Sequence, residues 1–222
     1  MNARAIAALT VLFMCGSAAG VEAQARKHSW ELAAGAIWFG GTDLGDVTAT
    51  LERPGGGSLD LFRTSTSIDG APAASAALSF YLTPRVSLEA ALSYGRPVAA
   101  TRVSGDFEDA PAVTSAITLQ QYLAEGSVRW YLVRRVGGFR PFLRGGGGYL
   151  RQLDAGSALV ETGKTVHAGA GADRAFRERA TGRLRRLGLR LDARAVARTG
   201  GFDIDDKVRV GYAAGVHFFA GF

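Results

Sequence analysis

Residues 187–198 read LGLRLDARAVAR, and this stretch decides the fold class. Its odd positions are leucine or alanine throughout, whereas charged side chains occupy most of the even positions, from Arg190 to Arg198. Successive side chains of a β-strand point to opposite faces, so this alternation predicts a strand with one apolar and one polar face. A helix would need apolar residues every three to four positions, and the stretch does not have them.

Seven further segments repeat the same period of two along the chain. Each carries apolar residues at one parity and small or charged residues at the other. Thr83-Pro84-Arg85 lies between two of these segments and predicts the tight turn of a β-hairpin. The segments are 30–38, 76–82, 86–94, 122–132, 140–149, 165–176 and 208–222. The sequence therefore predicts an all-β chain of eight strands, without a helix of consequence.

The connections between these segments alternate in length. A long link that includes Pro54-Gly55-Gly56-Gly57 separates the first segment from the second, whereas the turns after 82 and after 132 are short. Long or polar links also occupy 96–111, 152–164 and 199–207. Short turns at one end and long loops at the other are typical of an antiparallel up-and-down transmembrane β-barrel.

The composition agrees with one folded domain. Of the 222 residues, 47% are hydrophobic and 21% are charged, which is too apolar for a disordered chain and too evenly mixed for a helical membrane bundle. The 30 glycines, against 6 prolines, favour turns and closely packed strands. The net charge of +6 suits an anionic partner such as nucleic acid or a lipid surface. Which of these partners applies depends on where the charges lie in the fold.

The first 25 residues predict a signal peptide. Arg4 precedes an apolar run over 6–15, and Ala23-Gln24-Ala25 has the small residues of a cleavage site. The run is shorter than the roughly 20 residues that a transmembrane helix needs. Cys15, the one cysteine of the sequence, lies in this leader, so we expect no disulfide in the mature barrel domain over 26–222.

The alternation alone does not tell which face of the barrel is outside. A soluble eight-stranded carrier of lipocalin type turns its apolar face inward. Three features favour the opposite arrangement: aromatic residues such as Trp30, Trp38 and Tyr94 near strand ends, a polar face that mixes small residues with charges of both signs, and a terminal Phe222. A closed barrel also pairs every backbone group, as hydrocarbon requires. We therefore predict that the apolar face contacts lipid and that the charges line the lumen.

The run from Arg140 to Leu150, RPFLRGGGGYL, resembles the bacterial outer-membrane β-barrel domain family, which includes the OmpA and OmpX barrels. The end of the chain, where Phe222 follows Phe218 and Val216 at the same parity, resembles the signal that the outer-membrane assembly machinery reads. The resemblance covers residues 26–222. It implies an eight-stranded barrel in the outer membrane of a Gram-negative-type cell, and it brings no shared catalytic residues.

The polar face carries the candidate functional residues, which project into the lumen if the apolar face contacts lipid. One hypothesis is a charged ion pathway, and the other is a set of salt bridges that plugs the lumen. Buried charges have to be paired, and eight strands leave room for little more than side chains, so the plug is favoured. The candidate residues are Glu31, Glu89, Glu125, Arg129, Arg144, Arg190, Asp192 and Arg194, with Asp173 and Arg209 at the same parity.

Catalytic chemistry finds little support in the sequence. Small outer-membrane barrels include lipid-modifying enzymes and proteases, and nucleophilic catalysis needs a base beside a serine. We expect His28 in solvent, His167 near a loop and His217 on a strand without a nearby serine. No spacing of His, Asp and Glu fits a metal site, and Gly145–Gly148 lacks the Lys-Ser/Thr of a phosphate loop. The prediction is that the protein is not an enzyme and uses no cofactor or metal.

Two surface features complete the prediction. The arginines within 174–186 are expected at the short-turn end, near anionic headgroups or periplasmic solvent rather than nucleic acid. The link 40–72 is the best candidate for contact with an extracellular ligand, and the alternative is a mobile, solvated loop. We predict a non-enzymatic outer-membrane barrel with a structural or surface-interaction role, whose partners are membrane lipid and the assembly machinery. The alternative function is a narrow pore for small solutes or ions.

Overall fold

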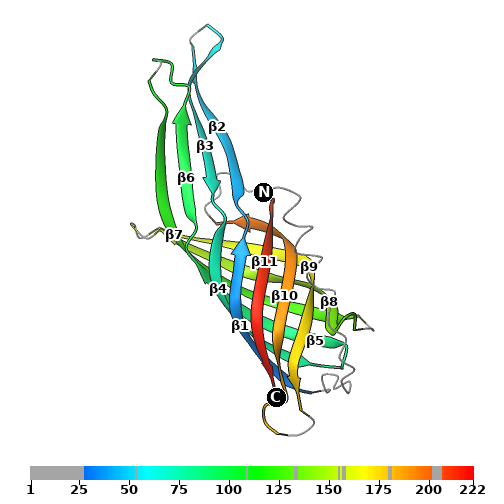
Figure 1. The fold of residues 1–222 in the computed structure, drawn as a ribbon. Helices are drawn as coiled ribbons and strands as arrows, with labels where there is room; N and C mark the ends of the chain where they lie inside the picture. The colour runs from blue at the N-terminus through cyan, green and yellow to red at the C-terminus, as the bar shows by residue number, and fades with distance from the viewer. Residues whose placement is uncertain are drawn as a thin grey trace.

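The computed structural model describes residues 28–53, 55–108, 110–132, 135–154, 156, 159–179, 182–201 and 207–222. Within these ranges the chain consists of β-strands and their connections (Figure 1). No helix in this part of the chain is long and apolar enough to cross a bilayer. The predicted signal peptide lies outside the described residues. The strands are β1 (Trp30–Phe39), β2 (Thr42–Glu52), β3 (Ser58–Ile68), β4 (Ala71–Tyr81), β5 (Val86–Gly95), β6 (Val98–Ser104), β7 (Val113–Tyr131), β8 (Phe139–Asp154), β9 (Val160–Glu178), β10 (Arg186–Gly200) and β11 (Arg209–Gly221).

Eight of the described strands close into an antiparallel barrel. They follow the cyclic order β1-β4-β5-β7-β8-β9-β10-β11, and β11 pairs with β1 to complete the ring. At this seam the Phe222 N–H donates a hydrogen bond to the Trp30 carbonyl at 2.8 Å. Closure leaves the barrel without a free sheet edge, which hydrocarbon requires. The predicted fold class is confirmed, and the eight predicted segments are the eight barrel strands in chain order.

The apolar parity of the barrel strands faces outward. Phe218 and Leu92 are 68% and 67% exposed, whereas Arg190 on β10 is 2% exposed. Exposed aromatic side chains lie near both ends of this surface, including Trp30 and Trp38 at the two ends of β1. Eight residues of strand span about 26 Å, or about 20 Å in height with the usual tilt, which is close to the apolar band of a transmembrane barrel. The predicted direction of the two faces is confirmed.

Inward glycines let neighbouring strands approach closely. A Cβ added at Gly146 on β8 would lie 2.1 Å from the Gly126 carbonyl oxygen, and one added at Gly169 on β9 would lie 2.2 Å from the Ala193 carbonyl oxygen. No side chain fits at either distance, so these positions need glycine. The Gly-rich run on β8 thus lies in a strand and serves close strand packing, as predicted.

The remaining strands form a second sheet beyond the long-loop end of the barrel. Its order is β2-β3-β6-β7, and it uses the first part of β7, whose second part lies in the barrel wall (Figure 1). We call these four strand segments the extracellular sheet, because the longer connections of transmembrane barrels lie on the extracellular side. The prediction of a loop over 40–72 is therefore wrong in its secondary structure, because 42–52 and 58–68 form a β-hairpin. The link over 96–111 likewise contains β6.

Long-range pairing explains why the alternation did not predict β2, β3 and β6. β3 pairs with β6, and the hydroxyls of Thr66 and Thr101 lie 3.2 Å apart across that pair. The strands are rich in Thr and Ser and alternate only weakly, so their partners define them. The predicted link over 152–164 is also mostly strand, since β8 extends to Asp154 and β9 begins at Val160.

The extracellular sheet reverses the polarity of the barrel wall. At the parity that faces the lumen lower on β7, it carries apolar side chains: Val47, Phe62, Val103, Val113 and Ile117. Where this face meets the barrel mouth, Leu44, Ile68, Ala99 and Leu119 form a buried cluster. The outward face instead carries polar residues such as Arg63 and Arg102. An outward face that changes from apolar to polar marks the boundary between lipid and water.

Candidate functional site

The barrel lumen brings together all eight candidate residues that the sequence predicted on the polar face. They come from five different strands, and each is at most 7% exposed. This set consists of Glu31 (β1), Glu89 (β5), Glu125 and Arg129 (β7), Arg144 (β8), and Arg190, Asp192 and Arg194 (β10). Asp173 on β9 joins them, whereas Arg209 lies at the mouth, where its guanidinium donates to the Leu44 carbonyl.

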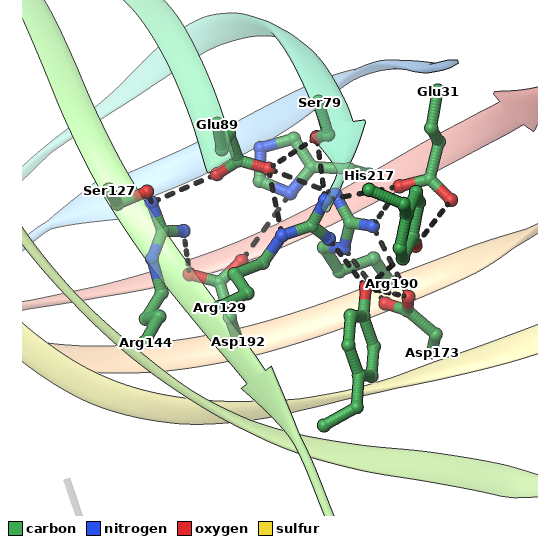
Figure 2. Close-up of polar contacts among 12 residues, drawn as sticks. Glu31, Ser79, Glu89, Ser127, Arg129, Arg144, Asp173, Arg190, Asp192 and His217 are labelled. Atoms are coloured by element: carbon green, nitrogen blue, oxygen red, sulfur yellow. Dashed lines mark hydrogen bonds and ion pairs between the residues drawn. The ribbon is translucent and has the colours of Figure 1, made fainter. Parts of the chain in front are cut away.

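Arg190 lies at the centre of the lumen and contacts three carboxylates (Figure 2). Its Nε donates to Oδ1 of Asp173 on the neighbouring strand at 2.8 Å, and its terminal nitrogens contact Glu31 and Oε2 of Glu89, the latter at 3.2 Å. In the ring of eight strands, β10 and β5 lie on opposite walls. The Arg190–Glu89 ion pair therefore crosses the full width of the barrel.

Arg129 is a second cross-lumen arginine, fully buried beside Arg190 (Figure 2). Its terminal nitrogen donates to Ser79 Oγ at 2.6 Å and lies 3.3 Å from Oε1 of Glu31, while its Nε lies 3.4 Å from Oε2 of Glu89. Two buried guanidinium groups thus share Glu31 and Glu89. The repulsion between the two guanidinium groups is offset only while both carboxylates stay in place.

Two tyrosines close the network toward the short-turn end. The Tyr81 and Tyr131 hydroxyls lie 2.9 Å apart; Tyr81 donates to Glu31 at 3.1 Å and Tyr131 donates to Asp173 at 2.8 Å. Phe142 packs beside them in a buried cluster. The alternation placed both tyrosines at the parity of the polar face, but neither was assigned a role in the sequence analysis. The available signal was that a tyrosine at lumen parity needs a polar partner for its hydroxyl.

Higher in the lumen, carboxylates pair with both arginine and histidine. Arg144 contacts Glu89 at 3.1 Å and Asp192 at 3.2 Å, and Nδ1 of His217 lies 3.5 Å from the other oxygen of Asp192. Above these, Glu125 contacts Arg194 and His167.

His167 corrects one sequence prediction. It was expected near a loop, yet it lies inside β9, buried in the lumen, with Nδ1 3.1 Å from Oε1 of Glu125. The reason is that β9 begins at Val160, so the residue is well inside the strand and at the inward parity. Both lumen histidines contact a carboxylate, and no group of three or more potential metal ligands occurs among the described residues.

Little space remains within the charged part of the lumen. The cavity bounded by Glu89, Arg144, Arg190 and His217 has a volume of about 10 Å³, roughly the room of one water molecule. Toward the mouth the lining becomes apolar, and a second cavity of about 50 Å³ lies there. Its lining includes Phe39, Ile68, Ala73, Leu123, Leu150 and Val196. Charged side chains thus fill the lower lumen, and the lining above them is mostly apolar.

The chain is similar to solved structures of outer-membrane proteins. The outer membrane protein OprG from Pseudomonas aeruginosa matches with a TM-score of 0.55 at 11% identity, over 90% of this chain and 99% of that chain. The N-terminal β-barrel domain of Pseudomonas aeruginosa OprF matches with a TM-score of 0.43 at 15% identity, over 88% and 98% of the two chains. The outer membrane protein AlkL, solved in DMPC bilayers, gives 0.44 at 14% identity, over 94% and 97%.

No family model matches the sequence, and no curated protein matches it. At these identities the likeness to OprG shows the fold. The closed barrel, its apolar exterior and its charged interior define an integral-membrane β-barrel of the outer-membrane type. The predicted resemblance is confirmed at the level of the fold.

Proposed function

We propose that this protein is a non-enzymatic outer-membrane barrel with a closed lumen, which acts as a membrane-structural element and through its extracellular sheet. The observation that carries this proposal is the ion pair between Arg190 and Glu89, which joins opposite walls within a filled network. An ion that passed this level would have to displace Arg190 from three carboxylates at once. Leaving those charges unpaired in a buried site is costly.

The extracellular sheet offers a preformed surface rather than a mobile loop. Its hairpin, 42–68, presents exposed Val47 and Phe62 on one face and polar residues on the other. Partially apolar, exposed surfaces of this kind are common at sites of interaction. This supports a surface-interaction role for the region 40–72 that the sequence analysis selected.

Conductance of the refolded protein in a planar bilayer tests the closed lumen. Barrel closure is verified in the same sample by heat-modified electrophoretic mobility, because a folded barrel resists detergent until it is heated. We expect a heat-modifiable protein with no discrete openings. Discrete, salt-dependent openings would contradict the proposal and favour a pore.

Passage of a small solute is the second candidate function, and the cavity at the mouth favours it. This cavity of about 50 Å³ lies where the apolar face of the extracellular sheet meets the lumen. Swelling of proteoliposomes in solutes of graded size separates the two functions. If the barrel is closed, vesicles that contain the protein should swell at the same rate as protein-free vesicles.

We also propose that residues 1–25 are removed on export and that the last strand is read during assembly. The position of Phe222 supports the second part, because its exposed ring and its hydrogen bond to Trp30 lie at the seam that closes the barrel. Cell fractionation together with N-terminal sequencing of the purified protein tests the first part. For the second, Phe222→Ala is expected to lower the amount of heat-modifiable protein in the membrane, while Phe176→Ala, at an exposed aromatic residue of β9 outside the last strand, serves as the comparison.

A further inference from the structure

Arginines gather at the short-turn end of the barrel, outside the lumen network. They lie in the turn between β4 and β5, on the last residues of β9, and between β9 and β10. We call this group the basic collar: Arg85, Arg174, Arg177, Arg179, Arg183 and Arg185. All are exposed except Arg185, which is half-buried.

The collar has no carboxylate of its own within the described residues. Glu178 lies among these arginines, but it contacts Arg135 at 2.9 Å and Arg186 at 3.6 Å. In the part of the chain that the structure describes, none of the six collar guanidinium groups forms an ion pair. Exposed arginines concentrated in this way leave a strong positive potential at one end of the barrel.

Part of the collar lies on the lipid-facing surface itself. Arg174 is directly opposite Leu189 on β10 and Phe139 on β8, so its side chain has the outward parity. Its guanidinium lies 5.2 Å from the centre of the Phe139 ring, and Arg177 is opposite Leu187. Between them Phe176 is 63% exposed. Arginine next to an exposed phenylalanine and outward-facing leucine side chains is the composition of a membrane–water interface.

We propose that the basic collar binds the phosphate groups of anionic phospholipids in the periplasmic leaflet. The occupant is a lipid headgroup rather than a free anion or a nucleic acid, because the arginines are continuous with the apolar wall and its aromatic residues. Guanidinium groups bind phosphate oxygens in bidentate fashion, and basic residues at a membrane surface attract anionic lipid.

The opposite end of the molecule supports this assignment by its charge. The hairpin 42–68 contains Asp43, Asp46, Glu52 and Asp60 against Arg53 and Arg63. Positive charge is therefore concentrated at the short-turn end, which faces the periplasm in barrels of this class. The proposal rests on the outer-membrane placement proposed above.

Tryptophan quenching by brominated lipids tests the proposal in the refolded full chain. Trp30 and Trp130 report from the collar end, whereas Trp38 reports from the other end of the wall. In the Trp38→Phe background, vesicles of phosphatidylcholine with brominated phosphatidylglycerol are compared with vesicles that contain brominated phosphatidylcholine. We expect a relative binding constant of about fivefold in favour of phosphatidylglycerol, which high salt reduces.

The quadruple variant R174Q/R177Q/R179Q/R183Q removes most of the collar. Its preference for phosphatidylglycerol is expected to fall to about one. The matched control R53Q/R63Q/R96Q/R102Q removes four exposed arginines from the extracellular end and is expected to keep the full preference. Should the quadruple variant not fold, R179Q/R183Q, in the connection between β9 and β10, is expected to lose about half of the preference.

Equal quenching by the two lipids, or an equal loss in both quadruple variants, would overturn the proposal. So would a preference that excess inorganic phosphate abolishes at constant ionic strength, because the site would then be one for a free anion. Heat-modified mobility and conductance are measured for each variant. A closed, heat-modifiable barrel without lipid preference rejects the collar alone, whereas a conducting barrel with preference rejects the closed lumen alone.

Discussion

The barrel wall and the extracellular sheet use the same alternation with opposite meaning, and β7 runs through both. In its barrel part, Glu125 and Arg129 face inward and are buried, while Val128 and Trp130 face outward and are exposed. In its extracellular part the inward parity carries Val113 and Ile117. The surroundings therefore decide which face must be apolar, because lipid lies outside the barrel wall and water lies outside the extracellular sheet.

The two regions also differ in what holds them together. The barrel interior depends on ion pairs and hydrogen bonds between distant strands, with Arg190 and Arg129 at the centre. The extracellular sheet has a small apolar cluster of Leu44, Ile68, Ala99 and Leu119 at its foot. Substitutions of the same type should therefore have unequal effects in the two regions.

The largest effect is expected from Arg190→Ala. It leaves Glu31, Glu89 and Asp173 without their central partner, and removing one member of a buried ion network costs about 3–5 kcal/mol. The measurement is the urea midpoint of the heat-modifiable form. Arg102→Ala, on the polar face of the extracellular sheet, is the control and should change stability by about 0.5 kcal/mol or less. Equal midpoints for the two variants would show that the lumen is not paired as described.

A charged residue on the outer wall should have the next largest effect. Leu92→Arg places a guanidinium in the middle of the lipid-facing band and is expected to destabilise the barrel by about 2–4 kcal/mol. Val113→Arg, at a side chain of similar exposure in the extracellular sheet, should cost less than about 1 kcal/mol because water solvates the new charge. Refolding yield and urea midpoint in lipid vesicles compare the two. A Leu92 variant as stable as the Val113 variant would break the contrast between lipid and water.

Removal of one lumen hydroxyl should have an intermediate effect. Tyr131→Phe removes the group that bonds Tyr81, Arg129 and Asp173, and we expect a loss of about 1–3 kcal/mol. Tyr122→Phe is the matched control, because its exposed hydroxyl makes one long contact, at 3.4 Å, with Gln120. The same urea titration measures both, and a larger loss for Tyr122→Phe would contradict the importance of the network.

The smallest effect on the barrel is expected from removal of the extracellular hairpin. Thr42 and Ile68 are directly paired, so an Asn-Gly turn can join them in place of 43–67. The eight wall strands keep all their partners, and the barrel should lose about 1 kcal/mol or less. Heat-modified mobility of the shortened chain checks this. A chain that no longer resists detergent would show that the sheet and the barrel fold as one unit.

Much of the candidate site could be predicted from parity alone. In a strand with one lipid-facing side, every charge at the opposite parity faces the lumen, and Glu31, Arg129 and Arg190 were found in this way. His167 was misplaced because the start of β9 is not marked by alternation. Tyr81 and Tyr131 were placed at lumen parity without a role, because a tyrosine there looks like an ordinary aromatic residue until its hydroxyl partners are known.

The eight strands and the two faces of each could be predicted from the amino-acid sequence, because period-two alternation is a local property of the chain. Aromatic residues near strand ends and the mixed charges of the polar face then indicated which face meets lipid. Which lumen charges meet depends on the tertiary structure. Arg190 and Glu89 are far apart in sequence, and the stagger of the closed sheet sets their contact. The extracellular sheet was likewise decided by pairing between β3 and β6, since weakly alternating strands become strands only when a partner takes up their backbone hydrogen bonds.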